Sequence, residues 1–141
     1  MRLSLASTPA FSTAGRQTFG AWCFNTDVIG RAVYIMGPKV GALYQVTSVD
    51  YENPLRMRAI GIIVAKSTAQ KCTVMTSGII SNIYTGYTED HALFVGFSGM
   101  LQDGPPERPS SGVRISQLMA VVLSSTDIFV CPQLPTVLVG D

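Results

Sequence analysis

The alternation of apolar and polar residues predicts a chain built almost entirely of short β-strands. Stiff β-branched residues recur along the sequence, and frequent Gly and Pro divide the apolar stretches into short runs. Strands are predicted over residues 31–36, 42–49, 55–64, 71–77, 92–97, 114–123 and 127–131. Only 114–123 could pass for a short helix, and its Val-Val-Leu ending favours a strand. The expected fold class is all-β.

Two neighbouring runs differ in the environment they predict. In Leu55-Arg56-Met57-Arg58-Ala59, apolar and cationic residues alternate with the period of a half-buried strand. The next five residues, 60–64, are apolar on both faces. We therefore expect 60–64 to be covered on both sides.

Internal similarity suggests that the domain contains two copies of one small unit. Segments 32–35, 41–43, 60–64, 72–74 and 77–80 correspond to 92–95, 99–101, 119–123, 129–131 and 135–138, at offsets of 57 to 60 positions. Each copy would be a small β-meander, which cannot bury its apolar face alone. Two copies, about 32–80 and 92–138, would pack into a compact β-sandwich or a short β-barrel. Strand order, and hence the choice between these two, cannot be read from the sequence.

Composition indicates that much of the surface faces other protein. The chain has 141 residues, enough for one domain, and 47% of them are hydrophobic. Only 13% are charged, against about 25% in an average soluble protein. With a net charge of +1 and no basic stripe, nucleic acid is not an expected partner. No secretory or membrane-spanning run is found, so we expect neither a membrane partner nor an oxidising compartment.

Residues 1–26 differ from the single β domain predicted for 27–141. They are rich in Ser, Thr, Ala and Gly and have no acid before Asp27. Such a segment is often a frayed terminus, but we favour an extended N-terminal arm that packs on neighbouring subunits. Aromatic and Arg side chains anchor interfaces, so the interface candidates in the arm are Arg2, Phe11, Arg16, Phe19 and Trp22.

The sequence offers little for catalysis or metal binding. His91 is the single histidine, and it follows Glu89 and Asp90. Adjacent residues of an extended chain point to opposite faces, so we interpret this stretch as a polar turn that enters the strand at Ala92. An enzyme would become a credible hypothesis only if His91 lay in a pocket with an acidic side chain opposite it.

Two further motifs also favour turns over chemistry. In residues 96–99, Gly-Phe-Ser-Gly, the second Gly comes one position too early for a nucleophile elbow, which favours a hairpin turn. Asp50 and Glu52 could supply oxygen ligands to a hard cation, but the nearby Asn53-Pro54 favours a turn there.

The cysteines do not indicate a catalytic or metal-binding site either. Cys23, Cys72 and Cys131 are far apart and are expected to behave as small apolar residues. We therefore predict no catalytic residue, no cofactor and no metal.

Three segments remain as possible interfaces. Residues 102–112 form a Pro-rich loop that is either an exposed recognition element or a long solvated connection. Two tyrosines lie in the linker between the copies, where they either contact a partner or cap the core. The C-terminal 134–141 has alternating apolar residues and should be paired, within the domain or across a subunit boundary. The interface candidates outside the arm are Tyr84, Tyr87, Pro105, Pro106, Glu107 and Arg108.

Residues 27–138 resemble modules of tailed-bacteriophage virion proteins. Residues 58–80, in which a strand leads through a short turn to an apolar Ser-Gly-Ile-Ile segment, look like the core of small head-decoration proteins. Residues 92–101 and 117–132 look like a module that is also found in tail-fibre and collar proteins. The resemblance rests on apolar and turn positions. It implies an all-β domain without catalysis that binds a capsid or tail, often as a homotrimer.

The resulting hypothesis is a virion structural protein, made in the host cytoplasm, whose partners are the major capsid protein or other virion proteins. As a capsid decoration, or cement, protein it would stabilise the head shell by binding across capsid subunits. The alternative is a neck, collar or tail-fibre attachment protein, in which the Pro-rich loop would be the recognition element.

Overall fold

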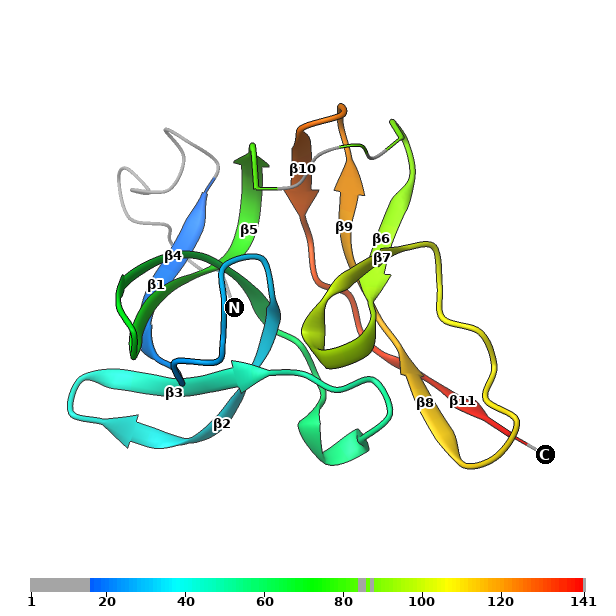
Figure 1. The fold of residues 1–141 in the computed structure, drawn as a ribbon, viewed down its shortest axis with the longest axis horizontal. Helices are drawn as coiled ribbons and strands as arrows, with labels where there is room; N and C mark the ends of the chain where they lie inside the picture. Colours follow the sequence, from blue (N-terminus) through cyan, green and yellow to red (C-terminus); the bar gives the residue numbers. More distant parts are fainter. Residues whose placement is uncertain (1–15, 84–85, 87, 141) are drawn as a thin grey trace, which may run out of the picture.

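The computed structural model describes residues 16–140 except 84, 85 and 87, and over these residues the chain is almost entirely β. Strands make up 52% of the described residues, and no helix among them reaches seven residues, which confirms the predicted fold class. No helix in this part of the chain is long and apolar enough to cross a membrane. The elements in order (Figure 1) are β1 (Gln17–Trp22), β2 (Ala32–Val40), β3 (Leu43–Ser48), the short 3-10 helix η2 (Pro54–Arg56), β4 (Gly61–Thr68), β5 (Lys71–Ser81), β6 (Ala92–Val95), η3 (Phe97–Gly99), β7 (Leu101–Asp103), β8 (Val113–Ser116), β9 (Leu118–Val122), β10 (Asp127–Val130) and β11 (Thr136–Val139).

Five strands close into a small barrel, which settles the choice between sandwich and barrel. Their order is β1-β3-β2-β4-β5, and β5 pairs back onto β1 to complete the ring. The pairing of β1 with β3 is parallel, whereas the pairings β3–β2, β2–β4, β4–β5 and β5–β1 are antiparallel. Two of these pairings are short, since β1 meets β3 and β2 meets β4 over two residue pairs each.

Strand β5 also begins a second, open sheet. Its first part pairs with β1 and β4, and its last residues, Gly78 to Ser81, pair with β10. From there the sheet continues as β5-β10-β9-β6-β7. The remaining strands, β8 and β11, form a separate two-stranded ribbon that extends away from the barrel at the lower right of Figure 1.

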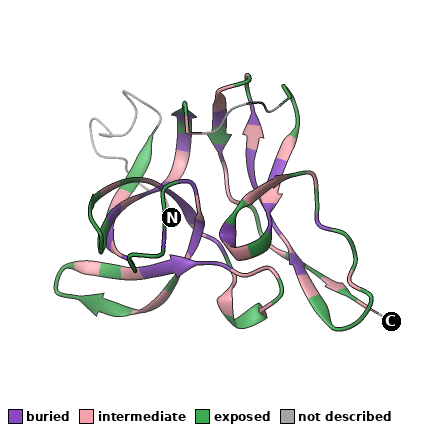
Figure 2. Ribbon diagram, viewed as in Figure 1, coloured by how far each residue is buried: buried purple, intermediate pink, exposed green. Residues whose placement is uncertain are grey.

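The two sheets create two hydrophobic cores (Figure 2). The smaller core fills the barrel with buried side chains from or next to each of its five strands: Ala21, Cys23, Val33, Val46, Ile63, Cys72 and Val74. The larger core lies between the barrel wall and the inner face of the open sheet, and it includes Ile62, Met75, Leu93, Met119 and Ile128. Ile62 and Ile63 are neighbours in β4 but belong to different cores. The prediction that 60–64 is covered on both sides is thus confirmed.

Gly61 lets β4 approach β5 closely at the start of its pairing. A Cβ atom at this position would lie 2.4 Å from the carbonyl oxygen of Met75 and 2.7 Å from a methyl group of Val74. Both neighbours are buried, so neither can move away without disturbing a core. Glycine is therefore required here by space, since any side chain would push the two strands apart.

Three predicted boundaries differ from the structure. Residues 17–22 of the predicted arm form β1, because Ala21 and the following Cys23 are needed inside the barrel. The alternating stretch 55–59 is no strand: Pro54 begins η2, and Asn53 accepts a hydrogen bond from the amide of Leu55, which favours a turn. The predicted strand 114–123 is divided into β8 and β9 at Gln117, whose side chain is buried.

The two predicted repeats follow the same strand order. The first contributes β3-β2-β4-β5 and the second β7-β6-β9-β10. Val33 pairs with Gly61, and the corresponding residues Leu93 and Ala120 pair with each other. The correspondence does not extend to 77–80 and 135–138, because the former continues β5 while most of the latter lies in β11. A repeated unit thus stays a prediction.

Gln117 connects three parts of the chain through its buried side-chain amide. The side chain is in the protein interior, with 1% of its surface exposed. Its Oε1 accepts from the amide of Ala59 (2.9 Å), and its Nε2 donates to the carbonyls of Ala59 and Gln133 (both 2.8 Å). The segment before β4, the start of β9 and the chain after β10 are joined at this one residue.

We predict that Gln117→Met lowers the free energy of unfolding by about 2–4 kcal/mol, because each buried polar group left without a partner costs about 1–3 kcal/mol. Methionine keeps the length of the side chain but can neither donate nor accept in the same way. Urea denaturation measures the change. The control is Gln133→Met, since exposed Gln133 makes only a local side-chain bond to the carbonyl of Cys131. Equal losses in the two variants would contradict the prediction.

Asp27 holds the loop before β2 onto the end of β3. Its carboxylate is buried and accepts from the Thr47 hydroxyl (3.1 Å), from the Ser48 hydroxyl (2.7 Å) and amide (2.9 Å), and from the Phe24 amide (3.0 Å). Lys66 donates to the main-chain carbonyl of Asp27 at 2.6 Å. The buried carboxylate therefore has donors on both oxygens, as such a group requires.

We predict that Asp27→Ala destabilises the fold by about 3–5 kcal/mol, because four donors lose a charged acceptor. Asp27→Asn should cost less, since its amide oxygen can still face Thr47 and Ser48. Thermal unfolding followed by circular dichroism ranks the variants. Asp50→Ala is the matched control, because the Asp50 side chain accepts from the Glu52 amide at an exposed turn. A loss as small as that of the control would refute the role of Asp27.

Candidate functional site

The outer face of the open sheet carries a row of apolar side chains. Ala92, Val121, Phe129 and Ile79 are direct cross-strand neighbours on β6, β9, β10 and β5. Their sequence neighbours point the other way into the larger core, as Leu93, Val122, Ile128 and Ile80 do. Ile79 is 48% and Phe129 is 38% exposed. We call this set of four residues the outer row.

Further apolar residues extend the outer row along the same strands. Residues two positions apart share a face of a strand, so Phe94 of β6 lies beside the row. Leu123 and Cys131, each one residue beyond the end of β9 or β10, continue the same alternation. Leu123 is 46% exposed, and the other two are partly buried. Asp127, two residues before Phe129, is a charge at the border of this face. The result is a contiguous apolar surface, a property typical of protein-binding sites.

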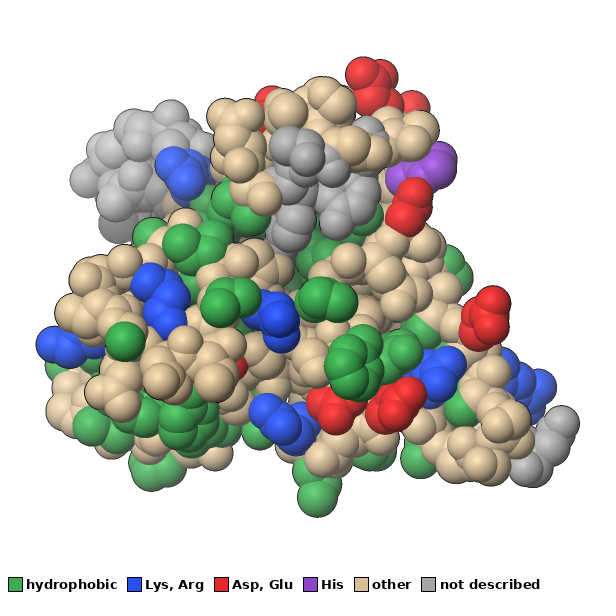
Figure 3. All heavy atoms as spheres, in the orientation of Figure 1, with side chains coloured by type: hydrophobic (Ala, Val, Ile, Leu, Met, Phe, Trp, Pro, Cys, Tyr) green, Lys and Arg blue, Asp and Glu red, His purple; other side chains and the backbone are tan. Residues whose placement is uncertain are grey.

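A second group of exposed apolar residues lies on the barrel. Ile35, Val40 and Tyr44 on β2 and β3 are each between 43% and 49% exposed. The ring of Tyr44 meets Phe19 edge-on at 6.2 Å, and the ammonium group of Lys39 lies 4.7 Å from the Tyr44 ring. In Figure 3, hydrophobic side chains gather at the lower left, over β2 and β3. Lys39 thus places a cation at the border of this group, as Asp127 places an anion at the border of the outer row.

The predicted interface residues of the arm are separated by the structure. Arg2 and Phe11 lie outside the described residues, and Arg16 is exposed just before β1. Phe19 packs partly against the barrel core. Trp22 meets Phe24 edge-on, with 5.1 Å between ring centroids. Phe19 and Trp22 are thus wall residues of the barrel, because β1 is needed to close it.

The Pro-rich loop lies against the β8–β11 ribbon. Arg114 of β8 donates to the carbonyl of Glu107 (2.9 Å), and Arg108 donates to the carbonyl of Val139 (2.6 Å). Pro106 is buried, whereas Pro105, Glu107 and Arg108 are exposed. Exposed side chains on a tethered main chain remain compatible with recognition. Tyr84 and Tyr87 lie outside the described residues.

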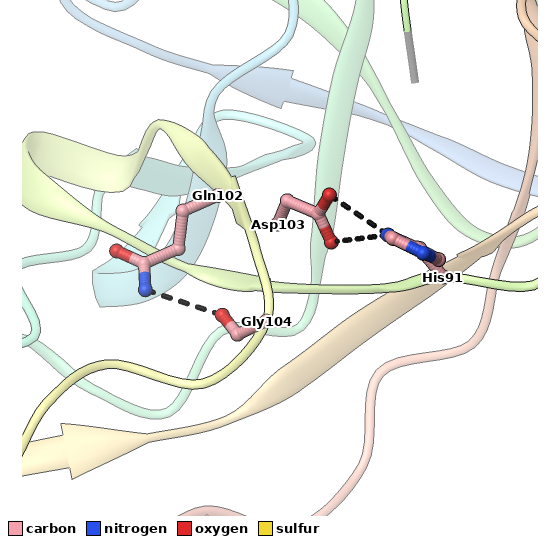
Figure 4. A network of polar contacts seen from close by, with 4 residues as sticks. All are labelled: His91, Gln102, Asp103 and Gly104. Carbon is pink, nitrogen blue, oxygen red and sulfur yellow. Dashed lines mark hydrogen bonds and ion pairs between the residues drawn. The ribbon is translucent and has the colours of Figure 1, made fainter. Parts of the chain in front are cut away.

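His91 has an acid across from it, although not one of its sequence neighbours. Its Nδ1 lies 3.0 and 2.9 Å from the two carboxylate oxygens of Asp103 at the end of β7 (Figure 4). Glu89 and Asp90 form the predicted turn before β6. This pair could not be predicted from the sequence, because it depends on the register of the β6–β7 hairpin.

The geometry of the pair defines what it can do. A carboxylate at Nδ1 favours the tautomer that leaves Nε2 as a proton acceptor, an arrangement used in general-base catalysis. Both side chains are 48% exposed. An exposed His–Asp pair of this kind needs a nucleophile within reach of Nε2 to act as a base, and none of the hydrogen bonds of the described residues supplies one.

The two predicted turns are present. Residues 96–99 connect β6 to β7, and the amide of Gly96 donates to the carbonyl of Met100 at 2.6 Å. Asp50 accepts from the amide of Glu52 at 3.0 Å, and Glu52 pairs with Arg114 at 3.1 Å. Across the described residues, no group of three or more His, Cys, Asp or Glu side chains could hold a metal ion.

The cysteines lie in apolar surroundings. Cys23 and Cys72 are buried in the barrel core, and Cys131 is partly buried; all three are free thiols. Burial, together with a hydrogen bond to Cys23, raises the pKa of Cys72 to about 12. Burial also raises the pKa of Cys131 above its ordinary value. Thiols held in the neutral form are weak nucleophiles, in agreement with their predicted role as small apolar residues.

A polar pocket lies where the hairpin turn meets the barrel. It has a volume of about 190 Å³ and is lined by residues that include Asp27, Arg31, Arg56 and Ser98. Arg31 donates to the carbonyl of Ser98 (2.8 Å), and Arg56 donates to that of Ser48 (3.1 Å). The arginines thus fasten the loops around the pocket, and two acids, Asp27 and Asp50, balance their charge.

Comparisons of the chain with models of protein families, with curated proteins and with solved structures gave no match.

Proposed function

We propose that this protein is a structural component of a virion and that it works by binding other protein through the outer row. The observation that carries the proposal is the row itself, in which Ala92, Val121, Phe129 and Ile79 present a continuous apolar strip across four strands. Burying such a strip against a partner is favourable by about 25 cal/mol per Å² of apolar surface. Only 13% of the residues are charged, so few charged side chains are available to favour exposure of this face to solvent.

The kind of partner is proposed from the resemblance of residues 27–138 to phage head-decoration and tail modules. In the decoration role, the barrel and open sheet form a compact body, and the outer row contacts the major capsid protein. Many copies, each with a modest apolar contact, would together resist the pressure of packaged DNA. Such a binding role requires neither the exposed His91–Asp103 pair nor the thiols.

Copy number in purified virions tests where the protein acts. We expect hundreds of copies, in a simple ratio to the major capsid protein, when both are quantified by mass spectrometry. About a dozen copies would move the protein to the neck, collar or tail. Its absence from virions would overturn both assignments.

We further predict that Phe129→Asp weakens binding to capsids that lack the protein by about tenfold or more, because it places a charge in the centre of an apolar contact. The matched control is Tyr44→Asp, which changes an aromatic residue of similar exposure on the barrel, 43% against 38%. Binding is measured by cosedimentation, and circular dichroism verifies that both variants are folded. If Phe129→Asp binds like wild type, the outer row is not the contact.

A further inference from the structure

The outer edge of β11 belongs to a strand whose own residues carry no charge, although Arg108 from the Pro-rich loop contacts the edge at Val139. Within the described residues, β11 pairs with β8 and with no other strand. The far side of β8 is occupied, since the amide of Ile115 donates to the carbonyl of Tyr51 at 2.6 Å. Exposed edges are normally blunted by charged side chains or covered, because their free backbone groups attract other strands. Thr136-Val-Leu-Val139 contains no charge.

The hydrogen bonds at the end of the ribbon show which backbone groups face outward. The amide of Gly140 donates to the carbonyl of Gly112 (2.8 Å), so residue 140 points toward the β8 side. In an antiparallel ladder, successive residues alternate between the two edges. Val139 therefore points outward, and its carbonyl indeed accepts from Arg108 outside the ladder (2.6 Å). By the same alternation, Val137 and Pro135 direct their backbone groups to the outer edge.

We propose that two copies of this chain associate by antiparallel pairing of their β11 strands about a two-fold axis at Val137. The two Val137 residues would exchange N–H···O bonds with each other. The amide of each Val139 would donate to the carbonyl of Pro135 in the other copy. The ribbons would thereby join into one continuous sheet across the two copies.

The pattern of donors and acceptors argues for a second copy as the occupant. In this register the carbonyl of Val139 faces the nitrogen of Pro135, which has no hydrogen to donate. That carbonyl is the one already bonded to Arg108. The Val139 carbonyl, which a second copy cannot satisfy, is thus satisfied within the chain. Every other outward N–H or carbonyl group from 135 to 139 faces a backbone acceptor or donor of the second copy.

Side chains and charge also permit this association. Val137 and Val139 are 55% and 56% exposed, and they share one face of the ribbon with Val113, which is 39% exposed. Pairing of the two edges would bring these valines into one apolar patch, with no charged residue of β11 opposed to its own copy. The net charge of +1 per chain gives little repulsion between copies. The association involves a different surface from the outer row and does not depend on the virion assignment.

Sedimentation velocity of the full-length protein across a dilution series tests the proposal. We expect a reversible dimer. Val137→Pro should raise its dissociation constant by about tenfold to a hundredfold, because one N–H per copy is lost from the centre of the pair. The β8 ladder should stay intact, since this N–H faces outward. Val137→Thr, which keeps the donor and the β-branch, is the matched control and should dimerise like wild type.

A second variant tests the same strand edge in case the proline variant does not fold. Val137→Glu places two like charges on either side of the axis and should also give monomers, whereas Val40→Glu, at a residue 49% exposed on the barrel, should not. Hydrogen exchange should show slower exchange of the Val137 and Val139 amides as concentration rises. A monomeric wild type, or any oligomer that survives both Val137→Pro and Val137→Glu in folded protein, would overturn the proposal.

Discussion

Because β5 continues for four residues beyond its last barrel pair, Ser77 with Gln17, the barrel cannot be the whole fold. The backbone groups of Gly78 to Ser81 need partners, and β10 supplies them along one edge. Once β10 is in place, the open sheet follows, and its inner face must be covered. The barrel wall covers it through Ile62 and Met75, which forms the larger core. One strand that serves two sheets thereby fixes the position of both.

The same constraint explains why polar residues are buried at the junction. Where the barrel meets the open sheet, the chain crosses between layers in loops whose backbone groups lack strand partners. Gln117 provides the missing partners for Ala59 and Gln133, and Asp27 does so for Phe24 and Ser48. Both side chains are almost fully buried. Each side chain thus takes the place of a strand partner for the loops that it joins.

The sequence was sufficient for the fold class and for most strands, since apolar alternation and turn residues are local signals. It failed where a distant partner decides the structure. Residues 17–22 fall in the predicted arm, whose composition is rich in Ser, Thr, Ala and Gly, yet they close the barrel. The break at Gln117 depends on Ala59, and the His91–Asp103 pair depends on hairpin register. The outer row was also invisible, because its members come from four strands whose order cannot be read from the chain.

The shortage of charge has a structural counterpart in how the arginines are used. Arg31, Arg56 and Arg108 donate to the carbonyls of Ser98, Ser48 and Val139, and Arg114 joins the carbonyl of Glu107 to the carboxylate of Glu52. Each therefore fastens a loop or a chain end instead of covering a strand face with charge. With few charged residues left for the faces of the open sheet and the ribbon, these surfaces remain apolar. The arginines that stabilise the loops thus leave the faces of the open sheet and the ribbon without their charge. These apolar faces are the surfaces best suited to bind other protein.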